Sequence, residues 1–198
     1  MSVVFASLRD SDVARLLASG AVGVIPTDTV YGVVARAADP VAAGRVHQAK
    51  HREGKPGTII AADVAQLVAL GLDSALLDRA AHLWPNPISV IIPASPELAY
   101  LHLGMESLAV RVPLDDDVHE LLTRTGPLIT SSANLAGQPP ANTLAEAQNY
   151  FGDTVDFYVD GGDLSGGLPS TLTKLLPDGT LEVLRQGNIT VQNKEKAP

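Results

Sequence analysis

Short apolar runs alternate along the chain with segments in which apolar residues recur every three or four positions. The first pattern is typical of buried strands, and the second of helices that cover a sheet. The apolar runs predict strands at residues 21–25, 33–37, 58–62, 88–92, 108–112, 128–131, 156–159, 171–175 and 181–184. The periodic segments predict helices at residues 11–19, 40–51, 64–70, 75–83, 115–124 and 144–150. Such alternation is typical of an α/β domain.

The lengths of the connections predict how the strands run relative to one another. The turn at residues 177–180 is too short for a crossover helix, so the strands on either side of it should be antiparallel. Longer helical connections allow parallel pairs, and we therefore expect a mixed sheet. Residues 188–198 are polar and lack periodicity, which predicts a C-terminal tail after one domain at residues 1–187.

Composition narrows the class of protein. The chain has 198 residues, a formal net charge of −8, 45% hydrophobic residues and 18% charged residues, which is typical of a globular domain. No apolar run approaches the roughly 20 residues that a membrane-spanning helix needs. Arg9 and Asp10 follow the first residues too closely for a signal peptide. The absence of cysteine excludes disulfides and thiolate chemistry. We expect a cytoplasmic protein with no membrane association.

Several familiar motifs are missing or have a simpler interpretation. The chain contains no P-loop, no G-x-G-x-x-G after a strand and no G-x-S-x-G. The glycine-rich residues 161–167 precede no helix, which favours a mobile loop over a phosphate cradle. His47 and His51 lack a third metal ligand, and Asp115–Asp117 stand where a helix begins, so we expect a solvated helix face and a helix cap. No resident metal site is predicted.

Four polar segments remain that resemble neither core nor an ordinary turn. They are residues 26–32, residues 50–56, residues 131–139, and residues 169–171 together with residues 185–187. The first could also be a turn capped by threonine or aspartate, and the cations of the second could complement a helix dipole. Together they offer hydroxyls, amides and cations but no nucleophile. This combination suits a site for phosphates and a small zwitterion.

The motifs in these segments follow a specific order. PTDTVYG at residues 26–32 is followed by K-x-R at 50–52, VRVP at 110–113, SSANLAGQPP at 131–140, PST at 169–171 and LRQG at 184–187. In this order they resemble the YrdC-like family of threonylcarbamoyl-AMP synthases, over about residues 21–187. The resemblance implies an α/β fold with a twisted, open mixed sheet and flanking helices around a concave cavity.

The resemblance also implies a reaction. Family members join L-threonine, bicarbonate and ATP, with Mg²⁺ accompanying the ATP, into threonylcarbamoyl-AMP and pyrophosphate. The product is used by downstream threonylcarbamoyl-transfer proteins for the t6A37 modification of tRNA. Because the substrate itself supplies the nucleophile, no covalent catalytic residue is expected.

Individual positions are carried over from the family motifs. L-threonine is expected to bind at Thr29, Tyr31, Arg111, Ser132 and Ser170. ATP is expected to bind at Lys50, Arg52, Lys55, Ser107, Asn134, Asn142 and Arg185. Arg111 should pair with the threonine carboxylate, because a planar, forked donor matches that group. The loop before Lys55 is one residue shorter than is common in the family. Lys55 therefore aligns with the family's ATP-binding position only across a one-residue gap.

Two other functions compete with this enzyme. An RNA-binding or ribosome-maturation factor could use the same cavity, but a net charge of −8 and one small basic cluster argue against a duplex footprint. We therefore expect tRNA to bind only weakly or indirectly. Carbamoyl transfer, as in hydrogenase-maturation proteins with a related domain, needs zinc-binding and acylphosphatase domains that this sequence lacks.

Overall fold

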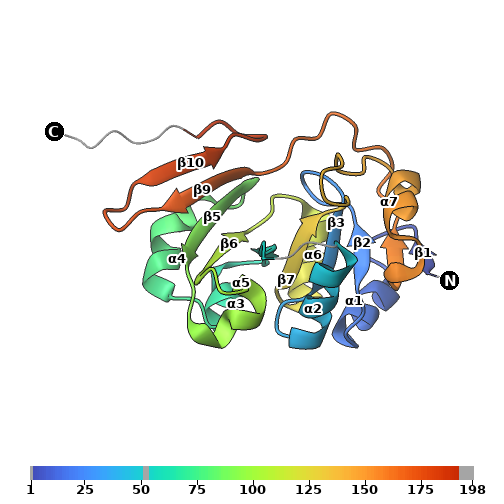
Figure 1. The fold of residues 1–198 in the computed structure, drawn as a ribbon, viewed down its shortest axis with the longest axis horizontal. Coiled ribbons are helices and arrows are strands. Elements are labelled where there is room, and N and C mark those ends of the chain that lie inside the picture. The colour runs from blue at the N-terminus through green and yellow to red at the C-terminus, as the bar shows by residue number, and fades with distance from the viewer. Residues whose placement is uncertain (1, 51–53, 192–198) are drawn as a thin grey trace.

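The computed structural model describes residues 2–50 and 54–191, in which ten strands form one twisted sheet (Figure 1). Across the sheet the strands lie in the order β1-β8-β2-β3-β7-β4-β6-β5-β9-β10. Their bounds are β1 Val3–Phe5, β2 Gly23–Ile25, β3 Gly32–Arg36, β4 Thr58–Ile60, β5 Ile88–Pro93, β6 Ser107–Arg111, β7 Leu128–Ser132, β8 Phe157–Val159, β9 Thr171–Leu175 and β10 Leu181–Arg185. The α-helices are α1 Ser11–Ala18, α2 Pro40–Ala49, α3 Val64–Ala69, α4 Ser74–Ala80, α5 Ala99–His102, α6 Asp116–Thr125 and α7 Leu144–Phe151.

The sheet is mixed, as the connection lengths predicted. Strand β8 runs parallel to both β1 and β2, and the pairs β4–β6 and β5–β9 are also parallel. The remaining neighbours are antiparallel, including the β9–β10 hairpin around the short turn. The predicted α/β fold class is therefore confirmed.

Side-chain caps fix the starts of two helices that the sequence predicted. Asp39 accepts hydrogen bonds from the amides of Val41 and Ala42 at 3.0 Å, and Pro40 occupies the first turn of α2. Asp115 accepts from the Val118 amide at 2.9 Å and begins α6. The predicted capping role of Asp115 is therefore confirmed.

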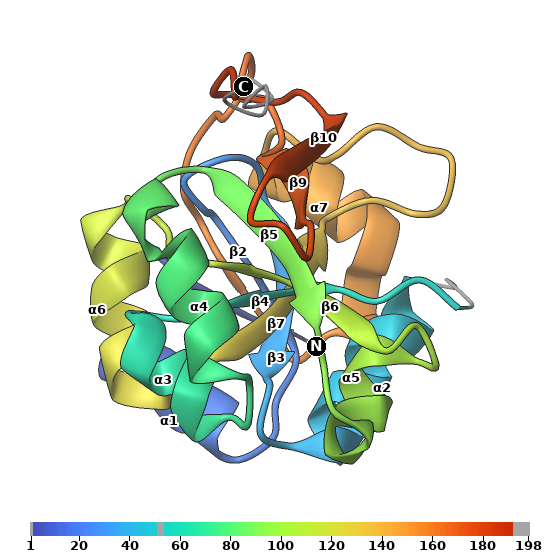
Figure 2. The same cartoon turned by 90° about the vertical axis from the view of Figure 1, so that its left-hand side faces the viewer.

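Successive strand residues alternate between two hydrophobic clusters, which therefore lie on opposite faces of the sheet. In β3, Val33 and Ala35 belong to the larger cluster, whereas Val34 belongs to the smaller one. The smaller cluster includes buried residues of α1 and α6. The larger includes buried residues of α2, α5 and α7. Figure 2 shows α1 and α6 on one side of the sheet and α2, α5 and α7 on the other.

Two elements and part of the C-terminal segment differ from the sequence-based expectation. Strand β1 and helix α5 were not predicted, since β1 is an edge strand with two exposed residues, and the four residues of α5 are too few to show periodicity. The predicted tail begins too early, because the Asn188 amide bonds the Pro169 carbonyl at 3.1 Å and Ile189 and Val191 pack against the larger cluster. Residues 192–198 lie outside the described residues. Nowhere in residues 2–50 and 54–191 is a helix long and apolar enough to cross a membrane.

Candidate functional site

A cavity of about 350 Å³ lies over the sheet, and its lining includes residues of every strand from β3 to β10 in the spatial order. The cavity floor lies on the same face of the sheet as α1 and α6. Strands β3, β4 and β7 show this, because each has one residue in the smaller hydrophobic cluster and another residue, two positions away on the same face, that lines the cavity. These pairs are Val34 and Gly32, Ile60 and Thr58, and Leu128 and Thr130. The cavity is thus the part of one sheet face that no helix covers.

Small side chains keep this part of the sheet open and closely packed. A Cβ on Gly32 would lie 2.6 Å from Thr130 Oγ1, and one on Gly57 would lie 2.8 Å from the Thr130 carbonyl oxygen. Among the described residues that line the cavity, only Arg111 and Arg185 are charged. Hydroxyls of threonine and serine provide most of the other polar groups. A cavity with two cations and several hydroxyls suits an anionic ligand.

The residues predicted to contact L-threonine converge on this cavity. All five line it, namely Thr29, Tyr31, Arg111, Ser132 and Ser170. Ser107 and Arg185 of the predicted ATP set line it as well. These seven residues come from segments up to 156 positions apart, from residue 29 to residue 185. The fold therefore brings the motifs to one place.

The segment that follows β2 is a tight turn organised by one hydroxyl. Thr27 Oγ1 accepts hydrogen bonds from the amides of Thr29 at 3.2 Å and Val30 at 3.3 Å, and it donates to the Val30 carbonyl at 2.7 Å. Its contact with Thr29 Oγ1 is 3.0 Å. Residues 26–32 therefore form a capped turn and also a wall of the cavity. This geometry is compatible both with the interpretation of the motif as a turn and with its interpretation as part of a binding site.

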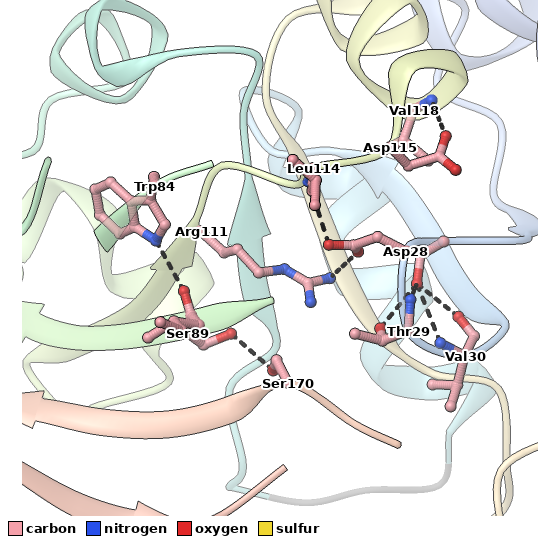
Figure 3. A network of polar contacts seen from close by, with 12 residues as sticks. Asp28, Thr29, Val30, Trp84, Ser89, Arg111, Leu114, Asp115, Val118 and Ser170 are labelled. Carbon is pink, nitrogen blue, oxygen red and sulfur yellow. Dashed lines mark hydrogen bonds and ion pairs between the residues drawn. The ribbon is translucent and has the colours of Figure 1, made fainter. Parts of the chain in front are cut away.

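Arg111 lies at the end of β6 and pairs with a carboxylate from this turn (Figure 3). Its Nη2 atom is 3.1 Å from Asp28 Oδ1, and both side chains are more than 90% buried, with exposed fractions of 4% and 6%. Asp28 Oδ2 also accepts from the Leu114 amide at 3.3 Å. Nε and Nη1 of Arg111 are buried and have no hydrogen-bond partner among the described residues. Burial lowers the pKa of Arg111, although Asp28 opposes this effect.

Two serines on neighbouring strands form the adjacent wall. The hydroxyls of Ser89 and Ser170 are 2.9 Å apart, and Ser89 is almost fully buried. Figure 3 shows the two side chains pointing toward each other. Arg185 Nη2 donates to the Ser170 carbonyl at 2.9 Å. Ser170 is therefore held on two sides, which fixes the wall on which a ligand would rest.

Tyr31 reaches the glycine-rich loop on the other face of the sheet. Its side chain is fully buried, and its hydroxyl accepts from the Gly161 amide at 2.8 Å and donates to the Gly162 carbonyl at 2.9 Å. Burial raises the pKa of this hydroxyl, which therefore stays protonated. Further along the loop, a Cβ on Gly167 would lie 2.3 Å from the Thr29 carbonyl oxygen. The prediction of a mobile loop is not supported, because these contacts anchor it to the turn that carries Thr29.

Lys50 joins the end of α2 to the segment after β7. Its Nζ donates to the Ser132 carbonyl and, at 2.9 Å, to Asn134 Oδ1, and the residue is 3% exposed. Asn134 Oδ1 also accepts from the Ser132 hydroxyl at 2.6 Å, while its Nδ2 donates to the Gln138 carbonyl at 2.8 Å. In this structure the buried Lys50 organises the serine-rich loop, so it is more than a cation on an exposed helix end.

The other predicted ATP residues have different environments. Lys55 is exposed and does not line the cavity. The Asn142 amide donates to Glu146 at 2.7 Å, and its carbonyl accepts from the Leu164 amide at 2.8 Å. Arg52 and His51 lie outside the described residues. Within the described ranges, no group of three His, Cys, Asp or Glu residues could hold a metal ion.

The sequence predicted no role for Ser89 and, for Asp28, only the alternative of a turn cap. Asp28 belongs to the PTDTVYG motif, but nothing in the sequence indicates that it meets Arg111, 83 positions away. Ser89 interrupts a predicted buried strand, and an isolated hydroxyl among apolar residues was the one available signal. The structure connects each of them to the site through a contact with a predicted site residue, Asp28 with Arg111 and Ser89 with Ser170.

Curated proteins with similar sequences are threonylcarbamoyl-AMP synthases, the family whose motifs this sequence resembles. The threonylcarbamoyl-AMP synthase of Pseudomonas aeruginosa is 36% identical over 180 residues, which cover 89% of this chain and 97% of that protein. The enzyme of the same name from Klebsiella pneumoniae is 38% identical over 169 residues, which cover 82% of this chain and 87% of that protein.

Solved structures share the fold. P. abyssi Sua5 complexed with L-threonine superposes with a TM-score of 0.80 at 26% identity, over 94% of this chain. This chain spans only 57% of that Sua5 chain. E. coli YciO superposes with a TM-score of 0.80 at 24% identity, over 94% of this chain and 96% of YciO, which supports the fold alone. The family profile described as "Telomere recombination" matches residues 15–187, and the chain belongs to the Sua5/YciO/YrdC family.

Proposed function

We propose that this protein is a threonylcarbamoyl-AMP synthase, a nucleotidyltransferase that makes threonylcarbamoyl-AMP and pyrophosphate from L-threonine, bicarbonate and ATP for the t6A37 modification of tRNA. The observation that carries the proposal is the buried Arg111 at the cavity, where two guanidinium nitrogens have no hydrogen-bond partner in residues 2–50 and 54–191 and hydroxyl side chains lie around them. Such a group is suited to the carboxylate of a small amino acid. The relatives that cover most of the chain bear the name of this enzyme.

The chemistry requires no protein nucleophile. The threonine amine forms a carbamate, either from CO₂ with loss of a proton to solvent or from bicarbonate with loss of water. A carbamate oxygen then forms a bond to the α-phosphorus of ATP. The bond from that phosphorus to the bridging oxygen breaks, and pyrophosphate leaves with the electron pair. The protein aligns the two reactants and neutralises the charge that develops on the leaving group.

Individual residues divide these tasks in the proposal. Arg111, Thr29, Ser132 and Ser170 hold threonine, and Tyr31 fixes the loop against which Thr29 rests. Arg185 and Ser107 face the nucleotide from the cavity wall. Lys50 and Asn134 hold the serine-rich loop in the form that receives the phosphates. Arg52, Lys55 and Asn142 are assigned to ATP by motif position.

Mg²⁺ enters this proposal as part of the substrate MgATP. The lining of the cavity supplies hydroxyls and cations and no free carboxylate, because Asp28 is paired with Arg111 and does not line it. This donor set fits a metal that arrives already bound to phosphates, where it shields the charge of the leaving pyrophosphate.

The test is release of pyrophosphate from ATP by the purified chain. Release should require L-threonine, bicarbonate and Mg²⁺ together, and threonylcarbamoyl-AMP should accumulate in equal amount. Equal release in the absence of threonine would overturn the proposal, since threonine supplies the attacking group.

The RNA-binding alternative makes a different prediction. A protein that neutralises many phosphates binds tRNA tightly at low salt and loses affinity steeply as salt rises. With a net charge of −8, this chain should bind tRNA only weakly, and its product should pass to separate threonylcarbamoyl-transfer proteins. A salt titration of tRNA binding distinguishes the two functions.

A further inference from the structure

We propose that Asp28 is a positioning residue that holds the guanidinium of Arg111 in place for the carboxylate of the amino-acid substrate. The inference rests on the proposed function and adds to it a residue that does not touch substrate. Asp28 is absent from the cavity lining, whereas its partner Arg111 lines the cavity.

The backbone around Asp28 fixes the direction of its side chain. Asp28 stands between Thr27 and Thr29 in the turn that Thr27 Oγ1 closes by accepting two amide hydrogen bonds. Thr27 and Thr29 line the cavity, while the side chain of Asp28 extends to Arg111 and the segment after β6 (Figure 3). A single short motif thus supplies both cavity hydroxyls and the anchor of the cavity cation.

The second carboxylate oxygen ties the ion pair to another element. Asp28 Oδ2 accepts from the Leu114 amide at 3.3 Å, and the next residue, Asp115, caps α6. Asp28 is therefore held from its own turn and from the chain that continues beyond Arg111. This arrangement limits the positions that the guanidinium can take.

Charge explains why Arg111 needs this partner. The side chain of Arg111 is only 4% exposed, and Nε and Nη1 make no hydrogen bond among the described residues. Burial lowers the pKa of Arg111, the carboxylate of Asp28 raises it, and the nearby charge of Arg185 lowers it again. A buried cation beside another cation is costly without an anion, so Asp28 stabilises the charged guanidinium before substrate arrives.

The test is Asp28→Asn, which keeps the shape of the side chain and an oxygen for the Leu114 amide but removes the charge. We expect the KM and Kd for L-threonine to rise about 10- to 100-fold, by analogy with the loss of affinity when the outer partner of a metal-ligating side chain is removed. The kcat at saturating threonine should change by less than about threefold, and the KM for ATP should stay near the wild-type value. Calorimetry with L-threonine gives the binding constant independently of turnover.

Two further variants keep the test decisive. Asp117→Asn breaks the exposed Arg9–Asp117 pair, whose contact is 2.7 Å, and should leave threonine binding unchanged. Asp28→Glu retains the charge but moves it by one methylene, so it should also raise the KM for threonine if position matters. If Asp28→Asn is folded and binds threonine as tightly as the wild type or more tightly, Asp28 does not position Arg111. If the wild-type chain itself does not bind threonine, the proposed function fails instead.

Discussion

Arg111 is a buried cation that has more hydrogen-bond donors than the described residues around it can satisfy. Its guanidinium has a single carboxylate partner, while Nε and Nη1 remain without hydrogen bonds among the described residues. Unpaired buried donors are costly, and native proteins keep them where a ligand will use them. Lys50 has the opposite arrangement, because protein acceptors already surround its ammonium group.

For Arg111→Lys we expect weaker threonine binding by about 1–3 kcal/mol, because lysine keeps the charge but loses the planar fork. ATP affinity should change much less. Calorimetry with each ligand checks this, with Arg15→Lys on the exposed face of α1 as the matched control. Unchanged threonine affinity would move Arg111 out of the carboxylate-binding role.

For Lys50→Ala we expect a loss of stability of about 1–3 kcal/mol, since Asn134 Oδ1 and the Ser132 carbonyl each lose a charged donor. Turnover should fall too, because the serine-rich loop loses its support. Lys55→Ala, at an exposed position, should change stability by less than about 0.5 kcal/mol. A thermal melt beside a pyrophosphate assay measures both effects, and an unchanged melting temperature for Lys50→Ala would contradict this structural role.

At the scale of elements, the shape of the cavity wall depends on close packing between loops as well as on the pairing of strands. The loop between β8 and β9 touches the turn after β2 at both of its ends, through Gly161 near Pro26 and Gly167 near Thr29. The strands that carry these loops lie side by side, since β2 pairs with β8. The cavity wall therefore depends on the glycine-rich residues 161–167 of this loop, none of which lines the cavity.

For Gly167→Ala we expect destabilisation by about 1–3 kcal/mol and weaker threonine binding, because the added Cβ would lie 2.3 Å from the Thr29 carbonyl oxygen. Gly44→Ala is the matched control. Gly44 lies within α2 with nothing within 4 Å of an added Cβ, so the same substitution should stabilise the protein by about 0.5–1 kcal/mol. Melting temperatures and threonine titrations of both variants check the contrast, and equal shifts in both would refute the close-packing argument.

At the scale of the whole molecule, Asp156 ties together parts of the sheet and a helix. It accepts from Arg45 of α2 at 2.9 Å and from the Val22 amide at 2.7 Å. Burial raises the pKa of Asp156, but the hydrogen bonds from Arg45 and Val22 and the charge of Arg45 outweigh this and lower it below 3.8. Asp156 therefore favours the folded state only while it is ionised.

A lowered carboxylate pKa stabilises the fold above the unfolded-state value and loses this effect as pH falls through the folded-state value. We therefore expect Asp156→Asn to be less stable than the wild type at pH 7. The difference in stability between the two proteins should shrink as pH falls below 3.8 and the wild-type carboxylate becomes protonated. Denaturant unfolding across this pH range measures the difference, and a constant gap down to pH 2 would show that the ionised carboxylate is not the cause.

Much of the fold was predictable because its determinants are local. Alternating apolar runs identified most strands, and Asp39 and Asp115 marked helix starts through caps that need only a few neighbouring residues. The motifs predicted seven of the residues that line the cavity, including Arg111 and Ser170, but also Lys55 and Asn142, which do not line it. Strand β1 was missed because it lies at the sheet edge with two exposed residues, and helix α5 because four residues carry too little periodicity.

The sequence by itself determined the class of fold, the composition of the site and the family motifs, since these depend on residue types and short spacings. Only the tertiary structure decided which groups meet, because strand order is set by packing across the whole sheet. It paired Asp28 with Arg111, placed Ser89 against Ser170, and engaged Lys50 with Ser132 and Asn134. It also left part of one sheet face without a helix, and that uncovered part became the cavity. Residues so distant in the chain meet only when the whole sheet has formed. A local sequence pattern does not specify which distant segments come together.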